Sequence, residues 1–260
     1  MLGQMVKIYF TRQGCNVVTF DERFSEYTWS MYHSFLKSLR NCIVINCVAK
    51  ISSKASSYGD LLNANAILPL ELRNSLEEDI YLVQPSSDGV FSGNKRDPYL
   101  LEDDRDAGDL YGWSKQLCEN ALVGRLNTLV TRVSIIGPTR GPTPKGFFSW
   151  VLAQKPGSKL KGYTNHFWNG ITTLEWCKRV ECFLIENNFP PENVIQFGTK
   201  EDCSKYDMLC LINEEYQRKL MIEPLQAEEF IDRRLNPGIL SKSLKEQLTD
   251  LKAFNLLNVK

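Results

Sequence analysis

The chain alternates short apolar runs with longer stretches in which apolar residues recur at helical spacing. Five short runs lack the strict polar alternation of a half-exposed strand, which indicates strands covered on both faces. They are Asn16–Phe20, Cys42–Cys47, Ile80–Gln84, Leu129–Val133 and Val194–Phe197. Helices are expected at Leu2–Gln13, Trp29–Leu39, Tyr58–Leu76 and Tyr111–Leu122. This order of strands and helices predicts an α/β fold built on a doubly wound parallel sheet.

The character of the sequence changes near residue 137. Residues Gly137–Pro144 form a segment dense in proline and glycine, which is typical of a loop. Beyond it come the segment Phe147–Leu152 and a turn around Pro156 and Gly157. The pattern then favours helices at Thr173–Asn187, Ser204–Tyr216 and Ser241–Phe254. The sequence therefore predicts a sheet domain formed by residues 1–136 and 193–199. A smaller C-terminal lobe, with a substrate-binding role, is expected from residues 137–192 and 200–260.

Composition excludes several classes of protein. The 260 residues contain 31 Lys and Arg against 31 Asp and Glu, so the charge balance gives no sign of a nucleic-acid or membrane-surface partner. No apolar stretch reaches the roughly 20 residues of a membrane helix. The first ten residues include Lys7 and lack the apolar core of a secretory signal. We expect a cytoplasmic protein.

Eight cysteines are spread along the chain without a CxxC pair, and only His33 and His166 could join them in a metal site. Metal ligands normally occur at closer spacing, so no metal is predicted. Reduced and mostly buried thiols are expected instead.

The chain opens in a helix where a nucleotide-binding sheet of this kind begins with a strand and a glycine-rich turn. Gly3 matches the last glycine of that turn, and the strand and the earlier glycines are missing. Losing four buried side chains of a central strand forfeits roughly 6–12 kcal/mol. We therefore expect a sheet that lacks its first strand, and a truncated reading frame or gene model.

The segment Tyr111–Lys115, downstream of Ser86–Asp88, carries the most informative chemistry. A phenol and an ammonium four residues apart share one face of a helix. A phenol titrates near pH ~10 in water, and a neighbouring cation favours its ionised form. With a hydroxyl that hydrogen-bonds a substrate oxygen, these groups can move a proton to or from a carbonyl.

Several motifs in order resemble the extended short-chain dehydrogenase/reductases, in particular the dTDP-4-dehydrorhamnose reductase-like branch that acts on sugar nucleotides. The resemblance extends from residue 2 to about residue 235 and implies a Rossmann-like, NAD(P)-binding sheet domain. The motifs are Asn46–Ala49, Asn65–Pro69, Ser86–Gly93, Tyr111–Lys115 followed by Glu119, Arg132–Gly137 and Lys161–Asn165.

The resemblance implies roles for the catalytic candidates. Tyr111 would protonate the sugar oxyanion, and Lys115 would assist it and hydrogen-bond the nicotinamide ribose. Ser87 would bind the substrate carbonyl, although Ser86 beside it leaves the register open by one residue. Asp88 would hydrogen-bond the substrate or tune the tyrosine, or it is an ordinary turn aspartate before Gly89.

Cofactor contacts are expected along the edge of the sheet. Leu2 and Gly3 would lie at a helix start, where free N–H groups and the helix dipole attract a diphosphate. Asp21 suits a free ribose 2′-hydroxyl and Arg23 a 2′-phosphate, so the choice between NAD and NADP stays open. Further cofactor-side candidates are Cys47, Val48, Ala49 and Asn65.

An aromatic and polar cluster at residues 162–170 could stack on a base or sugar, or pack on the lobe. Its substrate-binding candidates are Asn165, His166 and Trp168.

The leading hypothesis is an enzyme in which NAD(P)H reduces the 4-keto group of a nucleotide-linked deoxyhexose. The alternative is a non-catalytic NADP-binding module that resembles the regulatory subunit of methionine adenosyltransferase. An epimerase or dehydratase of the same superfamily is a third, weaker hypothesis. The expected partners are a nucleotide sugar and a second copy of the chain in a homodimer.

Overall fold

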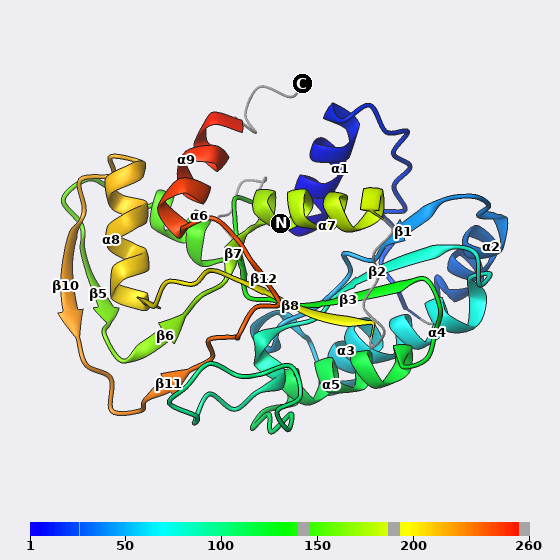
Figure 1. The fold of residues 1–260 in the computed structure, drawn as a ribbon, viewed down its shortest axis with the longest axis horizontal. Coiled ribbons are helices and arrows are strands. Elements are labelled where there is room, and N and C mark those ends of the chain that lie inside the picture. Colours follow the sequence, from blue (N-terminus) through cyan, green and yellow to red (C-terminus); the bar gives the residue numbers. More distant parts are fainter. Residues whose placement is uncertain (26, 140–145, 187–192, 255–260) are drawn as a thin grey trace.

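The computed structural model describes residues 1–25, 27–139, 146–186 and 193–254. A five-stranded parallel sheet lies at its centre, in the order β1-β2-β3-β8-β12. The strands are β1 (Ile43–Ile45), β2 (Tyr81–Pro85), β3 (Thr128–Arg132), β8 (Val194–Gly198) and β12 (Ile239–Leu240). Figure 1 shows helices on both faces of this sheet and a lobe beyond one end of it. The predicted α/β class and parallel sheet are confirmed.

Successive side chains of the inner strands point to opposite faces of the sheet and pack into two separate cores. Val83 and Leu129 pack into a core with the helices α1 (Leu2–Arg12) and α7 (Thr173–Glu186). Their neighbours Leu82 and Val130 point to the opposite face. There the helices are α2 (Trp29–Ser38), α4 (Leu68–Ser75) and α5 (Leu110–Leu122). Burial on both faces explains why these strands read as unbroken apolar runs.

The helix expected at Tyr58–Leu76 contains a wider turn in its middle. The α-helix α3 (Tyr58–Leu62) runs into a π-helical turn, η2 (Asn63–Ile67), which continues into α4. Pro69 has no N–H to donate to the carbonyl of Asn65, so regular α-helical bonding cannot continue through this point. Such turns are frequent at functional sites. This one directs the buried side chain of Asn65 toward α5.

The strand predicted at Asn16–Phe20 is wrong, because these residues form no regular secondary structure. Among the described residues β1 is paired only with β2, and residues 16–20 form no ladder with its other edge. Val18 is 72% exposed. Phe20 instead packs its ring against Tyr32 and Phe35 of α2, with both centroids 4.6 Å away.

Short strands build the lobe, and sequence patterns had not indicated them. They are β4 (Ile135–Ile136), β5 (Lys159–Tyr163), β6 (His166–Trp168), β7 (Ile171–Thr172), β9 (Cys203–Ser204), β10 (Met221–Leu225) and β11 (Ile231–Asp232). Its helices are α6 (Phe147–Leu152), α8 (Lys205–Glu215) and α9 (Leu244–Phe254). Short strands that alternate buried and exposed residues, as in β5, leave a weak signal.

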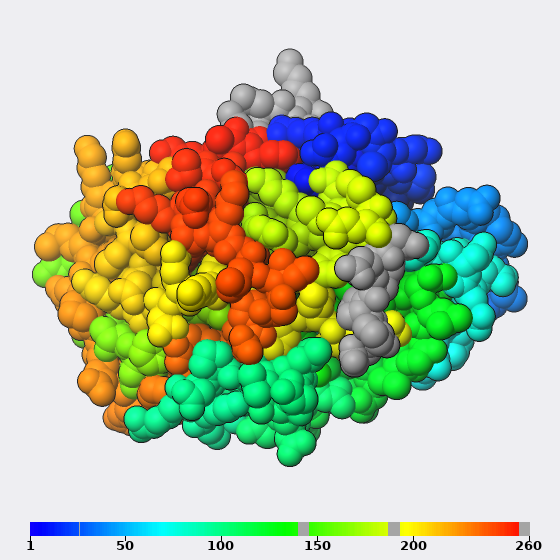
Figure 2. All heavy atoms as spheres, in the orientation of Figure 1, coloured from blue at the N-terminus to red at the C-terminus, as the bar shows by residue number. Residues whose placement is uncertain are grey.

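A surface segment ties the lobe to the sheet domain. Residues 92–106, the teal ridge along the lower edge in Figure 2, pair with the lobe through a bridge between Tyr99 and Leu235. On the opposite side, Arg12 of α1 donates to the carbonyl of Phe254 at the end of α9, at 2.6 Å. In the described part of the chain, no helix has the length and apolarity that crossing a membrane requires.

Candidate active site

The turn after β2 gives its two serines different tasks. The Ser86 hydroxyl donates to the Glu119 carboxylate at 2.6 Å, so its proton is already engaged within the protein. The Ser87 hydroxyl accepts from the Gly89 N–H at 3.0 Å and donates to Asp88 at 2.9 Å, which caps the short helix η3 (Asp88–Val90). Ser87 therefore has the hydroxyl that a substrate could engage by displacing Asp88.

Helix α5 brings Tyr111 against this turn. A Cβ added to Gly89 would lie 3.0 Å from a ring carbon of Tyr111 and 3.3 Å from the Ser87 hydroxyl. The phenol ring and the serine hydroxyl therefore flank the same α-carbon. This close approach needs glycine on the helix as well, because a Cβ at Gly112 would collide with the Gly89 carbonyl. Asp109 fixes the helix start by accepting from the Gly112 N–H at 2.7 Å.

Lys115 lies one turn after Tyr111 and is only 3% exposed. Its ammonium donates to the carbonyl of Pro85 at 3.0 Å. An ammonium has three N–H groups, and within the described ranges no protein acceptor is found for the other two. A buried cation in this state is suited to a pair of ligand hydroxyls.

The start of α1 lies at the carboxyl end of β1. A Cβ on Gly3 would lie 3.2 Å from the Cβ of Cys47, so Leu2 and Gly3 stand beside the segment that follows the strand. The first turn of α1 has no acidic residue and no side-chain cap, which keeps the positive end of the helix available to an anion. Burial raises the pKa of the Cys47 thiol to about 12, so this sulfur stays protonated at neutral pH.

Asn65 connects the segment after β1 to helix α5, which carries Tyr111 and Lys115. Its amide accepts from the Lys50 N–H and donates to the Lys50 carbonyl, both at 2.8 Å. The same amide donates to the Ser114 hydroxyl on α5 at 2.9 Å. Val48, which lies within the segment that Asn65 holds, is partly buried against the α2–α4 core, and Ala49 is exposed.

Asp21 and Arg23 lie farther out, on the exposed loop that follows Phe20. Asp21 accepts from the Thr19 hydroxyl at 3.0 Å, and Arg23 donates to Asp60 at 3.2 Å. The Lys50 ammonium also donates to Asp60 and holds the pKa of that carboxyl well below its usual value. Arg23 is thus linked to the segment after β1 through a shared carboxylate.

The three substrate candidates of the lobe are not brought together on one surface. The side-chain amide of Asn165 donates to the carbonyls of Ala227 and Glu229 and accepts from the Ala227 N–H. His166 packs its ring 4.6 Å from that of Tyr163 and lines a cavity. Trp168 is 3% exposed and belongs to the main core, so its ring is not available on the surface.

The cavity beside His166 has a volume of 310 Å³. Aromatic and basic side chains line it, among them Phe147, Trp150, Tyr163, Lys161 and Lys205. The ammonium of Lys205 stands 5.4 Å from the centre of the Phe147 ring.

Sequence reasoning missed Lys205, the first residue of α8. Its burial lowers the pKa, and nearby Asp88 opposes this shift. A cation in the first turn of a helix is electrostatically disfavoured. That unfavourable placement, next to the capping pair Ser204 and Asp207, was the available signal.

Comparison with known proteins places this geometry in a family. A family model described as the RmlD substrate binding domain matches residues 1–161, more than half of the chain. A search of curated protein sequences finds no match.

Solved structures share the fold at low identity. A dTDP-4-dehydrorhamnose reductase from Bacillus anthracis, crystallised with NADP, has a TM-score of 0.82 at 15% identity and covers 98% of this chain and 95% of its own. A dTDP-4-dehydrorhamnose reductase from Clostridium acetobutylicum has a TM-score of 0.77 at 19% identity and covers 97% of this chain and 95% of its own. A UDP-glucose 4-epimerase from Thermotoga maritima has a TM-score of 0.74 at 14% identity and covers 98% of this chain and 95% of its own. The chain belongs to the RmlD substrate binding domain family.

Proposed function

We propose that the chain is an NAD(P)H-dependent reductase of the 4-keto group of a nucleotide-linked 6-deoxyhexose. One observation carries this proposal. The Ser87 hydroxyl and the Tyr111 ring flank Gly89, and Lys115 stands buried one turn further along the same helix. Family membership and the resemblance of the fold to reductases of dTDP-4-dehydrorhamnose support it.

The residues on the sheet edge fit a dinucleotide. Leu2 and Gly3 offer an uncapped helix start to the diphosphate, and Lys115 offers two N–H groups to the ribose hydroxyls. A relative with this fold was crystallised with NADP. The remaining cofactor-side positions would be Cys47, Val48, Ala49 and Asn65, with Asp21 and Arg23 toward the adenosine ribose. When bound, the reduced cofactor supplies a hydride to the carbonyl carbon.

The side chains of this chain supply the proton. Ser87 turns its hydroxyl from Asp88 to the substrate carbonyl and holds that oxygen in place. Tyr111 transfers its phenolic proton to the oxygen as negative charge develops there. Lys115 stabilises the resulting tyrosinate through its positive charge, and solvent restores the proton.

The cavity lined by His166 and Lys205 suits the nucleotide part of the substrate, and the charge of Asp88 acts on Lys205. Phe147, Trp150 and Tyr163 offer aromatic faces to a base, and Lys205 and Lys161 offer charge to a diphosphate. Lys205 is partly buried, and no acceptor for its ammonium is found among the described residues. An anionic substrate would supply one, which explains a cation in an otherwise unfavourable place.

Turnover tests the proposal directly. Purified protein is mixed with NADPH or NADH and a 4-keto-6-deoxy sugar nucleotide, and oxidation of the nicotinamide is followed by absorbance. We expect turnover with at least one cofactor. Tight cofactor binding without turnover on dTDP- and UDP-linked 4-keto sugars would overturn the reductase and favour the regulatory module.

A substitution tests the substrate pocket separately. Lys205→Met should raise KM for the sugar nucleotide about tenfold, because one charge-assisted contact to phosphate is lost. The dissociation constant for NADPH should not change. Lys159→Met, at an exposed position on β5 that does not line the cavity, is the matched control.

A further inference from the structure

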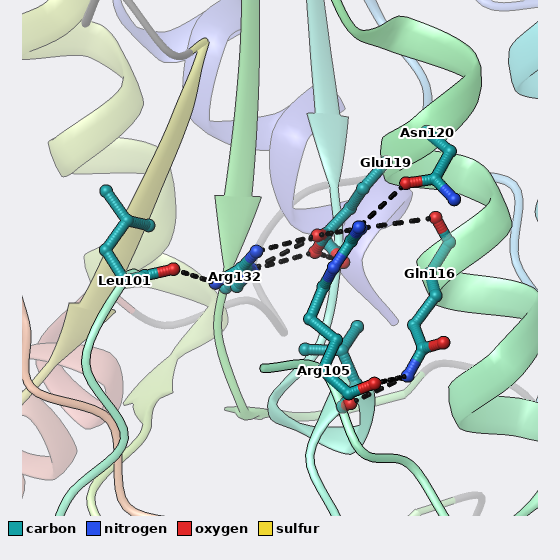
Figure 3. Close-up of polar contacts among 8 residues, drawn as sticks. Leu101, Arg105, Gln116, Glu119, Asn120 and Arg132 are labelled. Carbon is teal, nitrogen blue, oxygen red and sulfur yellow. Dashed lines mark hydrogen bonds and ion pairs between the residues drawn. The ribbon is translucent and has the colours of Figure 1, made fainter. Parts of the chain in front are cut away.

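Charged side chains of α5, β3 and the surface segment cluster around Glu119 (Figure 3), which also contacts the catalytic turn through Ser86. Glu119 is 2% exposed and accepts hydrogen bonds from two arginines. Arg132 of β3 donates through Nε at 3.0 Å and through a terminal nitrogen at 3.0 Å. Arg105 donates at 3.1 Å from the surface segment. Both arginines donate to this carboxylate, whose oxygens only accept hydrogen bonds.

The remaining contact of this carboxylate reaches the catalytic turn. The Ser86 hydroxyl donates to Glu119 at 2.6 Å, which is short, as expected for a charge-assisted bond. Because Glu119 is acceptor-only, the direction of the Ser86 hydroxyl is fixed. The Ser86 N–H continues the ladder to the Thr131 carbonyl at 2.8 Å. The backbone N–H and the side-chain hydroxyl of Ser86 are therefore both hydrogen-bonded, immediately before Ser87.

Helix α5 contacts the turn at three successive levels. Tyr111, Lys115 and Glu119 are spaced four residues apart and share one face of the helix. Lys115 holds the Pro85 carbonyl, Glu119 holds the Ser86 hydroxyl, and Tyr111 lies against Gly89. The first two contacts set the position of the turn relative to the helix that carries the tyrosine.

Arg132 anchors the cluster to the rest of the site. A terminal nitrogen donates to the Leu101 carbonyl at 2.8 Å, and its guanidinium lies 5.4 Å from the centre of the Phe91 ring. Figure 3 shows the Glu119 and Arg132 side chains pointing at one another between α5 and the sheet. The carboxylate is thus located by a strand, a helix and a surface segment together.

We propose that Glu119 is a positioning residue, which acts through the Ser86 hydroxyl to fix the Ser87 hydroxyl against Tyr111. The kinetic part of this inference rests on the proposed reductase function. Ser86 accordingly belongs to the support of the site and makes no contact with substrate. A misplacement of about 1 Å in such a site can cost a factor of 100 in rate.

Hydrogen exchange tests the positioning without turnover. Within the turn, the N–H groups of Gly89, Val90 and Phe91 are held by Ser87 and Asp88. Glu119→Gln and Ser86→Ala should each speed amide exchange over residues 87–91 at least about fivefold. The matched control is Glu175→Gln, because Glu175 is also 2% exposed and paired with an arginine, Arg179, but lies on α7. It should leave exchange at 87–91 unchanged.

Kinetics then test how Glu119 acts. Each of Ser86→Ala and Glu119→Gln should lower kcat about 10- to 30-fold with KM within about twofold. The kcat of the double variant should be little lower than that of Glu119→Gln alone, because both changes break the same hydrogen bond between Ser86 and Glu119. Glu175→Gln should keep the kcat of the wild type.

Two outcomes overturn the inference: equal exchange at 87–91 in Glu119→Gln and Glu175→Gln, or losses that multiply in the double variant. A wild-type protein that reduces no 4-keto sugar nucleotide defeats the proposed function alone, and the exchange experiment still decides the inference.

Discussion

The two ends of the site are built in different ways. At the chemical end, the turn at Ser86–Gly89 is held to α5 by buried contacts from Lys115 and Glu119. At the end proposed to bind the adenosine ribose, the ribose end, residues 13–23 have no regular structure, and Arg23 reaches Asp60 with 70% of its side chain accessible. The first end is fixed by the core, and the second by charge pairs at the surface.

This difference matches what each end has to do. Proton transfer needs the phenol and the serine hydroxyl within hydrogen-bond reach of one oxygen, so small displacements are costly. Recognition of a ribose or its phosphate needs mainly charge of the right sign. Exposed ion pairs contribute roughly 0–1 kcal/mol each, and they tolerate movement. Substitutions should therefore have large effects at the first end and small ones at the second.

The largest effect is expected at Tyr111. Tyr111→Phe removes the proton donor and keeps the ring against Gly89, so kcat should fall about 10³- to 10⁴-fold. Binding of NADPH and the melting temperature should stay close to wild type. Tyr216→Phe, on the lobe, is the control for loss of a phenolic hydroxyl, because the Tyr216 hydroxyl contacts the Leu248 carbonyl outside the proposed site. It should retain most of the activity. A Tyr111→Phe enzyme with more than about a tenth of wild-type kcat would contradict the proton-transfer role.

Lys115 should come next. Lys115→Met keeps much of the buried stem and removes the charge and the contact to Pro85. We expect kcat to fall about 100-fold and NADPH affinity to weaken, since the ammonium would serve both the tyrosine and the ribose. Steady-state kinetics and cofactor titration measure both. Loss of kcat with unchanged cofactor affinity would remove the ribose contact from the proposal.

The chemical end was also the end that sequence could predict. Tyr111 and Lys115 are four residues apart on one helix, so local spacing alone places them on one face. β2 and β3 were found because burial on both faces leaves unbroken apolar runs, and the less buried β1 and β8 were found from similar apolar runs. That Ser86 and Ser87 have different hydrogen-bond partners could not be predicted, since the partner of Ser86 is Glu119, 33 positions away.

Sequence reasoning failed where tertiary partners decide the outcome. Residues 16–20 have the composition of a strand, but a strand also needs a neighbour with which to share hydrogen bonds. Trp168 looked like a surface stacking residue because nothing nearby indicates that the lobe closes over it. Lys205 lies some 90 residues from the tyrosine, so no local pattern could place it beside Asp88.

A smaller effect is expected at Arg23, which would report the choice of cofactor. Arg23→Met should weaken NADPH binding about three- to tenfold and leave NADH binding unchanged, because only NADPH carries a 2′-phosphate. Titrations with both cofactors measure the ratio. Equal losses for the two cofactors would mean that Arg23 supports the loop through Asp60 and does not contact the phosphate.

The smallest effect is expected at Asp60, and it should depend on pH. Hydrogen bonds from Lys50 in particular hold the pKa of Asp60 well below its usual value. A carboxyl with a lowered native pKa stabilises the fold above its unfolded pKa of about 3.9, and this contribution is lost as the pH falls toward the native value. Asp60→Asn should therefore lower the melting temperature by no more than about 2 °C at pH 7.

The difference between Asp60→Asn and the wild type should shrink as the pH is lowered through 4 toward 2. Asp104→Asn, at an exposed carboxylate on the surface segment, controls for the loss of one charge and should show no such trend. A melting difference as large as that of a buried pair, or one that grows in acid, would show that the ribose end is held as firmly as the chemical end. The contrast between the two ends would then be wrong, and Arg23 and Lys50 would have to be counted with the fixed part of the site.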